Sequence, residues 1–465
     1  MPDPVVEKLH EWLRAHQDEL LADTRAMLRI ASIEGEPTPT APFGKENREA
    51  LDLALALSDK AGMQTKDLDG YIGYAEFGQG DRLILSLGHL DVVPVGPGWK
   101  HEPFGAEIDG DYLYARGSTD DKGPTMASFY AMRALKECFP EIPARMRQVF
   151  GCNEESGFNC VKRYVETEEP PTFGVAPDSG WPLYNGEKGI ANLNIEVPLN
   201  KGGEMELLEM CGGQRPNIVI DSAEAVVRVA PSARKHVEDK LADAWDRNIE
   251  SSWEGDVLRL KARGKAAHGS TPFLGDSAAT RVFRQLFEIA PVADETYYED
   301  LLKSTVTSGA GIGINGEDEV SRDLTCNLGI VSTEDGTLKL LFNVRYPVTW
   351  KGQELQDKCE SYLKTLKSGF KLASMSDSPS LYFPLEHPLV KAIVDVYREE
   401  TGDTKEPGVM GGGTYARALP NTVSIGTGWE GDGKAHETDE RLKVEHLFKM
   451  SRIYAHLFYR LATMD

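Results

Sequence analysis

Residues 82–94, RLILSLGHLDVVP, carry the pattern that decides the fold of this 465-residue chain. Residues 82–87 form a mostly apolar run, which is typical of a strand buried on both faces of a parallel sheet. His89 and Asp91 follow directly, so polar side chains stand where the predicted strand ends. In open α/β sheets, ligands bind outside the carboxyl ends of the strands. The stretch therefore predicts a central strand and, at its end, a site.

The sequence on both sides of this strand alternates between helical and strand patterns. An amphipathic helix is predicted from within residues 1–20, and the apolar spacing continues it to Ile30. Another helix is predicted to open at Gly123-Pro124, where the missing N–H of proline is tolerated. Further strands are predicted at residues 112–114, 147–150 and 173–176. This alternation predicts an α/β domain with a mostly parallel central sheet flanked by helices.

From about Gly186 the pattern changes to longer, alternating strands with helices between them. Strands are predicted at 191–197, 223–229, 256–262 and 338–344, and helices near 236–244 and 277–288. The first rhythm returns near residue 388, with a strand at 421–425 and a closing helix at 444–461. We expect one discontinuous domain made of residues 1–186 and 377–465, interrupted by an inserted α+β domain at residues 187–376.

The composition limits the partners that the protein can have. Its 51 Lys and Arg and 74 Asp and Glu give a net charge of −23. Nucleic acids and anionic membranes both reward a basic surface, so we expect neither as a partner. No stretch approaches the roughly 18 apolar residues that a membrane-spanning helix needs. The six cysteines are scattered without a CxxC pair, which favours free thiols and a cytoplasmic location.

Four more segments place acids or a histidine in loops near the predicted strand ends. They are ARGSTDDKG with Asp120 and Asp121, NEESG with Glu154 and Glu155, APDS with Asp178, and KAHETDE with His436. Each one alone is a common kind of solvated loop, because the chain has 74 acidic residues. Together, at the ends of strands in one alternating pattern, they favour a metal site.

The residue types indicate which metals would fit. Imidazoles mixed with carboxylates suit zinc, manganese or cobalt, and the lack of clustered cysteines disfavours an iron–sulfur or structural zinc site. Two histidines with three or four carboxylates exceed the ligands of one tetrahedral ion and fit two ions that share a carboxylate. We therefore expect two divalent metal ions, with zinc as the first choice and manganese or cobalt as alternatives.

The five segments, in this order, resemble the co-catalytic metallopeptidase family of aminoacylases, succinyl-diaminopimelate desuccinylases and dipeptidases. The resemblance extends over nearly the whole chain and is greatest to bacterial PepV-type dipeptidases. The strings that carry it are ARGSTDDKGP, NEESG, APDSG with NGEKG, GGGTYARALPN and AHETDE. Several independent motifs agree in order and spacing, so the resemblance is specific.

The resemblance implies a ligand set for the two ions in a catalytic domain. One ion would be bound by His89, Asp120 and Asp178, and the other by Asp120, Glu155 and His436. The motif leaves two registers for the shared carboxylate, Asp120 or Asp121, and counting Arg-Gly-x-x-Asp from Arg116 selects Asp120. The bond between Asp120 and Asp121 would be a cis peptide, as it is in the family.

Two further acids would act beside these ligands. The resemblance implies that Glu154 is the general base and that Asp91 orients the ring of His89. The free α-amine of a substrate would be held by an aspartate near the entrance, Asp178 or Asp121, and the sequence does not choose between them.

The inserted domain carries the remaining candidates, and from the residues alone most of them have ordinary interpretations. His268 in GKAAHGSTP would be a surface loop histidine, and Arg345 in FNVRYP a strand-surface arginine. The resemblance implies instead an enlarged lid in which His268 stabilises the oxyanion and Arg345 binds the substrate α-carboxylate. Asn217 matches a second lid position, and the glycine turn with Gly412, Gly413 and Thr414 would let the backbone approach a ligand.

These assignments imply a metal-dependent dipeptidase that cleaves short peptides with a free C-terminal carboxylate, using a metal-bridging water activated by Glu154. An N-acyl-amino-acid deacylase with the same metal site is the alternative reaction. A non-catalytic, metal-dependent ligand-binding protein is the alternative of another class. Because the enlarged lid would replace the partner subunit of dimeric relatives, the expected state is a monomer whose partners are small amide substrates.

Overall fold

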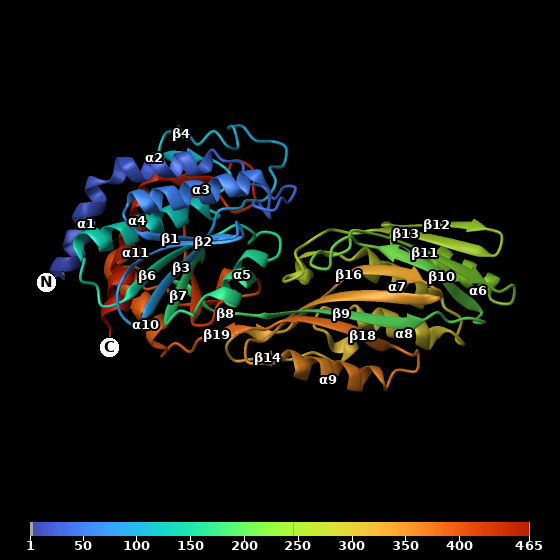
Figure 1. The fold of residues 1–465 in the computed structure, drawn as a ribbon. Coiled ribbons are helices and arrows are strands. Elements are labelled where there is room, and N and C mark those ends of the chain that lie inside the picture. Colours follow the sequence, from blue (N-terminus) through green and yellow to red (C-terminus); the bar gives the residue numbers. More distant parts are fainter. Residues whose placement is uncertain (1–2, 245, 465) are drawn as a thin grey trace. The chain divides into compact units, whose positions relative to one another are not determined.

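The computed structural model describes residues 3–244 and 246–464, and the contacts between residues divide the chain into two units (Figure 1). Unit 1 comprises Met1–Asn185, Phe383–Gly408 and Gly413–Asp465. Unit 2 comprises Gly186–Tyr382 and Val409–Gly412. Each unit has its own main sheet and its own helices.

The sheet of unit 1 has the strand order β1-β2-β6-β3-β7-β21-β8. Its strands are β1 (Gln64–Leu68), β2 (Ile72–Gly78), β3 (Leu83–His89), β6 (Arg145–Gly151), β7 (Phe173–Ser179), β8 (Leu183–Glu187) and β21 (Thr422–Gly426). Strands β6, β3, β7 and β21 run parallel, whereas β1, β2 and β8 pair antiparallel at the sides. The predicted α/β class is therefore confirmed, and the parallel part of the sheet is its centre.

Short strands complete this part of the chain. Strands β19 (Leu381–Tyr382) and β20 (Gly408–Met410) pair with β8. A separate three-stranded sheet has the order β22-β5-β4, with β4 (Glu107–Asp109), β5 (Tyr112–Tyr114) and β22 (Arg441–Lys443). The pairing of β22 with β5 joins two segments that flank predicted site residues, Asp120 and His436.

Helices flank the sheet of unit 1, as Figure 1 shows. They are α1 (Pro4–Ala15), α2 (Gln17–Leu28), α3 (Lys45–Lys60), α4 (Lys122–Cys138), α5 (Asn159–Thr167), α10 (Pro388–Thr401) and α11 (Val444–Thr463). Helix α4 packs on β3 and β6 and against α11. The approach of α4 to the end of β3 needs Gly88, because a Cβ there would lie 1.9 Å from Oγ1 of Thr125. This close packing sets α4, and the loop before it, beside His89.

The structure corrects the prediction of one continuous helix up to Ile30. The helix breaks at His16, where φ is −112° and ψ is 17°, and α2 ends at Leu28. The His16 ring stacks on Trp12 with ring centres 3.8 Å apart, and its Nδ1 lies 2.7 Å from the carbonyl oxygen of Trp12. These local contacts stabilise the end of α1. The spacing of apolar residues continues across the break and therefore does not reveal them.

Unit 2 is built on an eight-stranded sheet with the order β12-β13-β11-β10-β16-β17-β9-β18. The strands are β9 (Gly189–Pro198), β10 (Met205–Gly212), β11 (Ser222–Val229), β12 (Ile249–Glu254), β13 (Val257–Arg263), β16 (Thr325–Glu334), β17 (Thr337–Tyr346) and β18 (Lys371–Ser378). All neighbours in it pair antiparallel. Alternate residues of β9, β11 and β13 are buried, which explains their alternating sequence.

Four helices accompany this sheet, namely α6 (Arg234–Asp243), α7 (Ala278–Ile289), α8 (Glu295–Ser304) and α9 (Gly352–Leu363). Helix α7 packs on β11 and β13, and the apolar side chains between sheet and helices form one large core. The short elements of unit 2 are the 3₁₀ turns η1 (Pro272–Leu274) and η2 (Ala310–Ile312) and the hairpin of β14 (Glu317–Asp318) with β15 (Arg322–Asp323). None of the helices in the described parts of the chain has the length and apolar character needed to span a membrane.

Candidate active site

Unit 1 brings predicted metal ligands from separate loops together around Asp120. Nε2 of His89, at the end of β3, lies 3.1 Å from Oδ1 of Asp120, in the loop before α4. Nε2 of His436 lies 3.1 Å from Oδ2 of Asp120 and 3.1 Å from Oε1 of Glu155. Each oxygen of Asp120 therefore faces a different histidine. This is the arrangement that a carboxylate shared by two ions requires.

The distances in this cluster suit a metal. One donor atom each from His89, Asp120 and Glu155 can be chosen so that all three lie within 4.8 Å of one another. Two ligands of one tetrahedral zinc are separated by roughly 3.3 Å, because each bond is about 2.0 Å long. The observed contacts of 3.1 Å are close to that separation. Imidazole nitrogens with carboxylate oxygens are also the donors that zinc, manganese and cobalt accept.

Asp121 does not take the place of Asp120 in this cluster. Its carboxylate is fully buried, and Oδ2 accepts hydrogen bonds from the backbone N–H of His89 at 3.1 Å and the hydroxyl of Thr125 at 2.9 Å. The side chain thus ties β3 to α4 beneath the ligands. The peptide bond between Asp120 and Asp121 is cis, as the resemblance implied.

Asp91 holds the loop after β6 through its carboxylate and the ring of His89 through its backbone oxygen. Its two carboxylate oxygens accept the backbone N–H groups of Glu154 and Glu155, each at 3.0 Å. Nδ1 of His89 lies 2.9 Å from the backbone oxygen of Asp91 but 3.6 Å from its carboxylate. A carbonyl oxygen can only accept, so Nδ1 carries a proton and Nε2 faces Asp120. The imidazole is thus oriented by the main chain of Asp91, and the predicted carboxylate contact is too long for a hydrogen bond.

The electrostatics of the cluster reflect many acids in a small volume. Burial, reinforced by the charge of Asp178, raises the pKa of Glu154 well above its usual value. Asp178 lies in β7 and is half-buried, and its charge also acts on Asp121. Hydrogen bonds to Asp120 and Glu155 raise the pKa of His436 to about 10. A pair of dications would relieve the mutual repulsion of these carboxylates.

Three residues that the sequence reasoning did not single out support the cluster. Glu440 is buried beneath the loop that ends at Asp120. Lys122 is buried and donates to the carbonyl oxygen of Ile30 at 2.6 Å, and burial lowers its pKa to about 7. Tyr415 packs edge-on against the His89 ring at 5.9 Å between ring centres. All three lie in strings that carry the family resemblance, Lys122 in ARGSTDDKGP, Tyr415 in GGGTYARALPN and Glu440 in AHETDE, but none of these strings assigns them a role.

Unit 2 gathers the predicted residues of the inserted domain. The backbone of Gly269, next to His268, donates to the carbonyl oxygen of Asn217 at 2.7 Å, and Nδ1 of His268 lies 2.7 Å from Oγ of Ser270. Burial, with a smaller effect of the Arg345 charge, lowers the pKa of His268. The two predicted side chains therefore lie near each other, His268 in a loop and Arg345 on β17.

The guanidinium of Arg345 is held in a fixed orientation. Its Nη1 donates to the carbonyl oxygen of Gly411 at 2.9 Å and its Nε to Oδ1 of Asn343 at 3.1 Å. The predicted glycine turn falls on the border of the units, because Gly412 belongs to unit 2, whereas Gly413 and Thr414 belong to unit 1. The Thr414 hydroxyl accepts the N–H of Ala416 and so caps the 3₁₀ turn η3 (Tyr415–Ala418).

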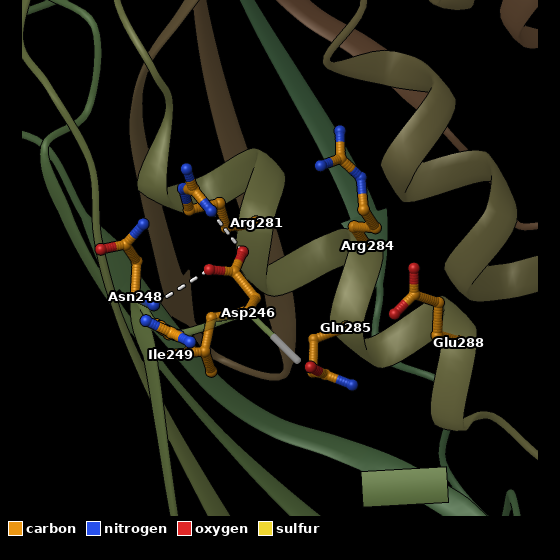
Figure 2. A pocket seen from close by; sticks show the side chains of 8 residues that line it. Asp246, Asn248, Ile249, Arg281, Arg284, Gln285 and Glu288 are labelled. Atoms are coloured by element: carbon orange, nitrogen blue, oxygen red, sulfur yellow. Dashed lines mark hydrogen bonds and ion pairs between the residues drawn. The ribbon is translucent and has the colours of Figure 1, made fainter. Parts of the chain in front are cut away.

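A cavity of about 550 Å³ lies elsewhere in unit 2 and contains none of the predicted residues (Figure 2). It is lined by α7 and the chain before β12, with the side chains of Asp246, Asn248, Arg281, Arg284, Gln285 and Glu288. Arg281 forms ion pairs with Asp246 and Asp276. These pairs compensate the half-buried charge of Arg281, and the residues named as the cavity's lining do not provide the imidazole and carboxylate donors of the cluster around Asp120.

Comparisons with known proteins identify the family of this chain. The chain matches the model of Peptidase family M20/M25/M40 over residues 85–460. It is 36% identical to "Putative dipeptidase YtjP" of Bacillus subtilis (strain 168), over 96% of this chain and 98% of that protein. It is 32% identical to "Putative dipeptidase SSP1012" of Staphylococcus saprophyticus, over 97% of this chain and 99% of that protein.

Solved structures are similar in fold. Human carnosine dipeptidase 1 has a TM-score of 0.57 at 16% identity, with 100% of both chains covered. Dug1p, a dipeptidase of Saccharomyces cerevisiae, has a TM-score of 0.54 at 14% identity, with 99% of both chains covered. At this identity the likeness concerns the fold alone. The family match and the sequence relatives establish that this chain belongs to Peptidase family M20/M25/M40.

Proposed function

We propose that this protein is a dipeptidase that depends on two divalent metal ions. The observation that carries the proposal is the position of Asp120, whose two carboxylate oxygens each lie 3.1 Å from a different histidine. The sequence relatives carry the name "Putative dipeptidase", which supports the same substrate class. Zinc is the proposed ion, and manganese or cobalt would fit the same donors.

The ligands of the ions would be those of the cluster. His89, Asp120 and Asp178 would hold one ion, and Asp120, Glu155 and His436 the other. Bound there, the ions would lower the pKa of a water molecule and polarise the scissile carbonyl. Their charge of +4 would meet −3 from the three carboxylates, so the site would bury little net charge.

Glu154 is the proposed general base. Its backbone is held by Asp91 at 3.0 Å, and its side chain is buried among other acids that raise its pKa. A carboxylate with a raised pKa is a stronger base than an exposed one and still gives up its proton readily. Glu154 would take a proton from the attacking water and deliver one to the leaving amine.

Unit 2 would recognise the substrate. The oriented guanidinium of Arg345 would bind the C-terminal carboxylate through paired hydrogen bonds, which limits substrates to short peptides. His268 would stabilise the oxyanion, and Asn217 and the turn at Gly412, Gly413 and Thr414 would contribute to substrate binding. We propose that residues 187–376 form the lid that supplies His268 within one chain, so that the working state is a monomer. The six free cysteines fit a reducing cytoplasm.

The test is release of free amino acids from matched substrates. Dipeptides, the same dipeptides with an amidated C-terminus and N-acyl amino acids would be offered to enzyme loaded with zinc or manganese, with a chelated control. The proposal requires metal-dependent cleavage of the dipeptides and poor cleavage of their amides. Cleavage of N-acyl amino acids alone would make the protein a deacylase, and sedimentation as an obligate dimer would exclude the monomer.

A further inference from the structure

A buried carboxylate lies directly beneath the central metal ligand. The side chain of Glu440 is fully buried and accepts five hydrogen bonds. Oε1 accepts from the N–H of Thr119 at 2.9 Å, its hydroxyl at 2.9 Å and the N–H of Asp120 at 3.2 Å. Oε2 accepts from Arg116 at 2.8 Å and the N–H of Gly117 at 3.1 Å. One side chain therefore fixes the whole turn that ends at Asp120.

Arg116 extends this network to the second half of the site. Its guanidinium is 2% exposed, lies 5.2 Å from the Trp99 ring and donates to the carbonyl oxygen of Glu437 at 3.2 Å. It also reaches the carbonyl oxygen of His436 at 3.5 Å. The backbone of His436 has φ of +66°, a left-handed conformation that few non-glycine residues adopt, so it needs such support.

The network thus joins two distant segments, each of which carries a ligand. Residues 116–120 contribute Asp120 and residues 436–440 contribute His436. The oxygens of Glu440 accept from backbone N–H groups, from the Thr119 hydroxyl and from Arg116, and Arg116 also donates to backbone oxygens, so these contacts act on the segments and not on the ligand side chains. Their geometry sets where the ligands stand, which is how partners behind a metal ligand raise its affinity.

We propose that Glu440, acting together with its partner Arg116, is a positioning residue. It holds Asp120 and His436 at the distance from each other that metal binding requires, before any ion binds. The proposal rests on the metal-binding part of the proposed function and is independent of the substrate. A merely structural role would make Glu440 matter for folding alone. A positioning role makes metal affinity depend on it in protein that is still folded.

The experiment compares Glu440→Gln with a control at a similar ion pair. Glutamine keeps the size but has one acceptor oxygen and places an NH₂ group against the donors of the turn. Glu76→Gln is the control, because Glu76 accepts from the buried Arg147 at 2.6 Å in the same unit, between β2 and β6. Affinity for Zn²⁺ and Mn²⁺ is measured by chelator competition without peptide, and folding by circular dichroism and melting.

We expect the dissociation constant of Glu440→Gln to rise about 10–100-fold, the usual effect of removing such a partner. Added metal should restore much of its activity, and Glu76→Gln should lose melting temperature with unchanged affinity. Affinity of Glu440→Gln within twofold of the wild-type protein would overturn the proposal. Wild-type protein that binds no ion would instead contradict the proposed function itself.

A milder variant keeps the test decisive if Glu440→Gln does not fold. Thr119→Val removes only the hydroxyl bond to Oε1 of Glu440 and retains the backbone bond. The proposal then requires a several-fold loss of metal affinity in the folded variant. If Glu440→Gln cannot be made and Thr119→Val binds the metal with unchanged affinity, the positioning role is contradicted.

Discussion

The carboxylate of Asp91 accepts the backbone N–H of Glu154 at 3.0 Å, and through its second oxygen it holds the next residue at the same distance. Asp91, two residues after the end of β3, therefore fixes the backbone of the proposed base and of a proposed metal ligand together. Through these two bonds, Asp91 couples the position of Glu154 to the position of Glu155.

Replacing Asp91 by asparagine should disturb this loop. An amide has one acceptor oxygen, so one of the two N–H groups would face an NH₂ group. We expect metal affinity and kcat/KM to fall about 10–100-fold, as measured by chelator competition and dipeptide cleavage. Asp318→Asn is the matched control, because Asp318 also accepts two backbone N–H groups but lies in unit 2. Equal behaviour of the two variants would exclude a special role for Asp91.

Glu154→Gln should separate proton transfer from metal binding. The amide cannot accept the proton, so we expect kcat to fall roughly 10²–10⁴-fold with metal content unchanged. Glu155→Gln, one residue along, should lose affinity for the metal instead. Isothermal titration with metal and steady-state kinetics distinguish the two variants, and near-normal turnover of Glu154→Gln would rule out Glu154 as the base.

His268→Ala should reduce turnover without changing the affinity for the metal. Loss of one oxyanion donor typically lowers kcat about 10²–10³-fold. His236→Ala serves as the control, since His236 lies on α6 of the same unit, where its Nε2 contacts the carbonyl oxygen of Ala290 at 3.2 Å. A full kcat for His268→Ala would remove this residue from the mechanism.

Removal of the metal should destabilise the protein. The carboxylates of Asp120, Glu154 and Glu155 repel each other without cations, and ligands that bind the native state stabilise it by mass action. We expect the melting temperature to fall by roughly 5–10 °C on chelation from metal about 100-fold above its dissociation constant. A melting temperature that stays constant after verified removal would contradict the proposed site.

Metal binding should release protons. In the metal-free protein, hydrogen bonds to Asp120 and Glu155 raise the pKa of His436 to about 10, so its ring is charged at neutral pH. An ion binds only the neutral imidazole, so affinity should weaken as the pH falls from 9 to 6. Calorimetry in buffers with different ionisation enthalpies measures the protons released. Binding that is independent of both pH and buffer would be inconsistent with His436 as a ligand.

The same shift has a consequence for the metal-free fold. Because the pKa of His436 is raised above its ordinary value of 6.5, protonation stabilises the folded state fully below pH 6.5. This contribution is lost as the pH rises through about 10. Metal-free protein should therefore lose melting temperature at alkaline pH, and His436→Gln should lose less than the wild-type protein over the same range.

The sequence predicts those parts of the fold that a local pattern specifies. The apolar run before His89 predicts β3, and all of its residues are buried. The antiparallel pairings of β2 with β6 and of β8 with β21 were not predicted, because they join segments that lie far apart along the chain. The break at His16 was missed for a related reason, since it depends on a ring stacking on Trp12 and not on apolar spacing.

The candidate site shows the same limit. Motifs place His89, Asp120 and Glu155 at loop positions, and the structure brings them together. The role of Glu440 could not be predicted from its motif, because the donors of its five hydrogen bonds lie 320 or more positions away in the chain. Asp91 does contact the ring of His89, but through its backbone oxygen, and the His-x-Asp spacing does not reveal which oxygen of Asp91 meets the ring.

Release of free amino acids from dipeptides by metal-loaded and chelated protein decides whether this protein is a metal-dependent dipeptidase. We predict cleavage that requires zinc or manganese, is lost on chelation, returns when metal is added back and disappears in Glu154→Gln. Protein that binds the metal yet cleaves neither dipeptides nor N-acyl amino acids would contradict this prediction, and would favour a protein that only binds its ligand.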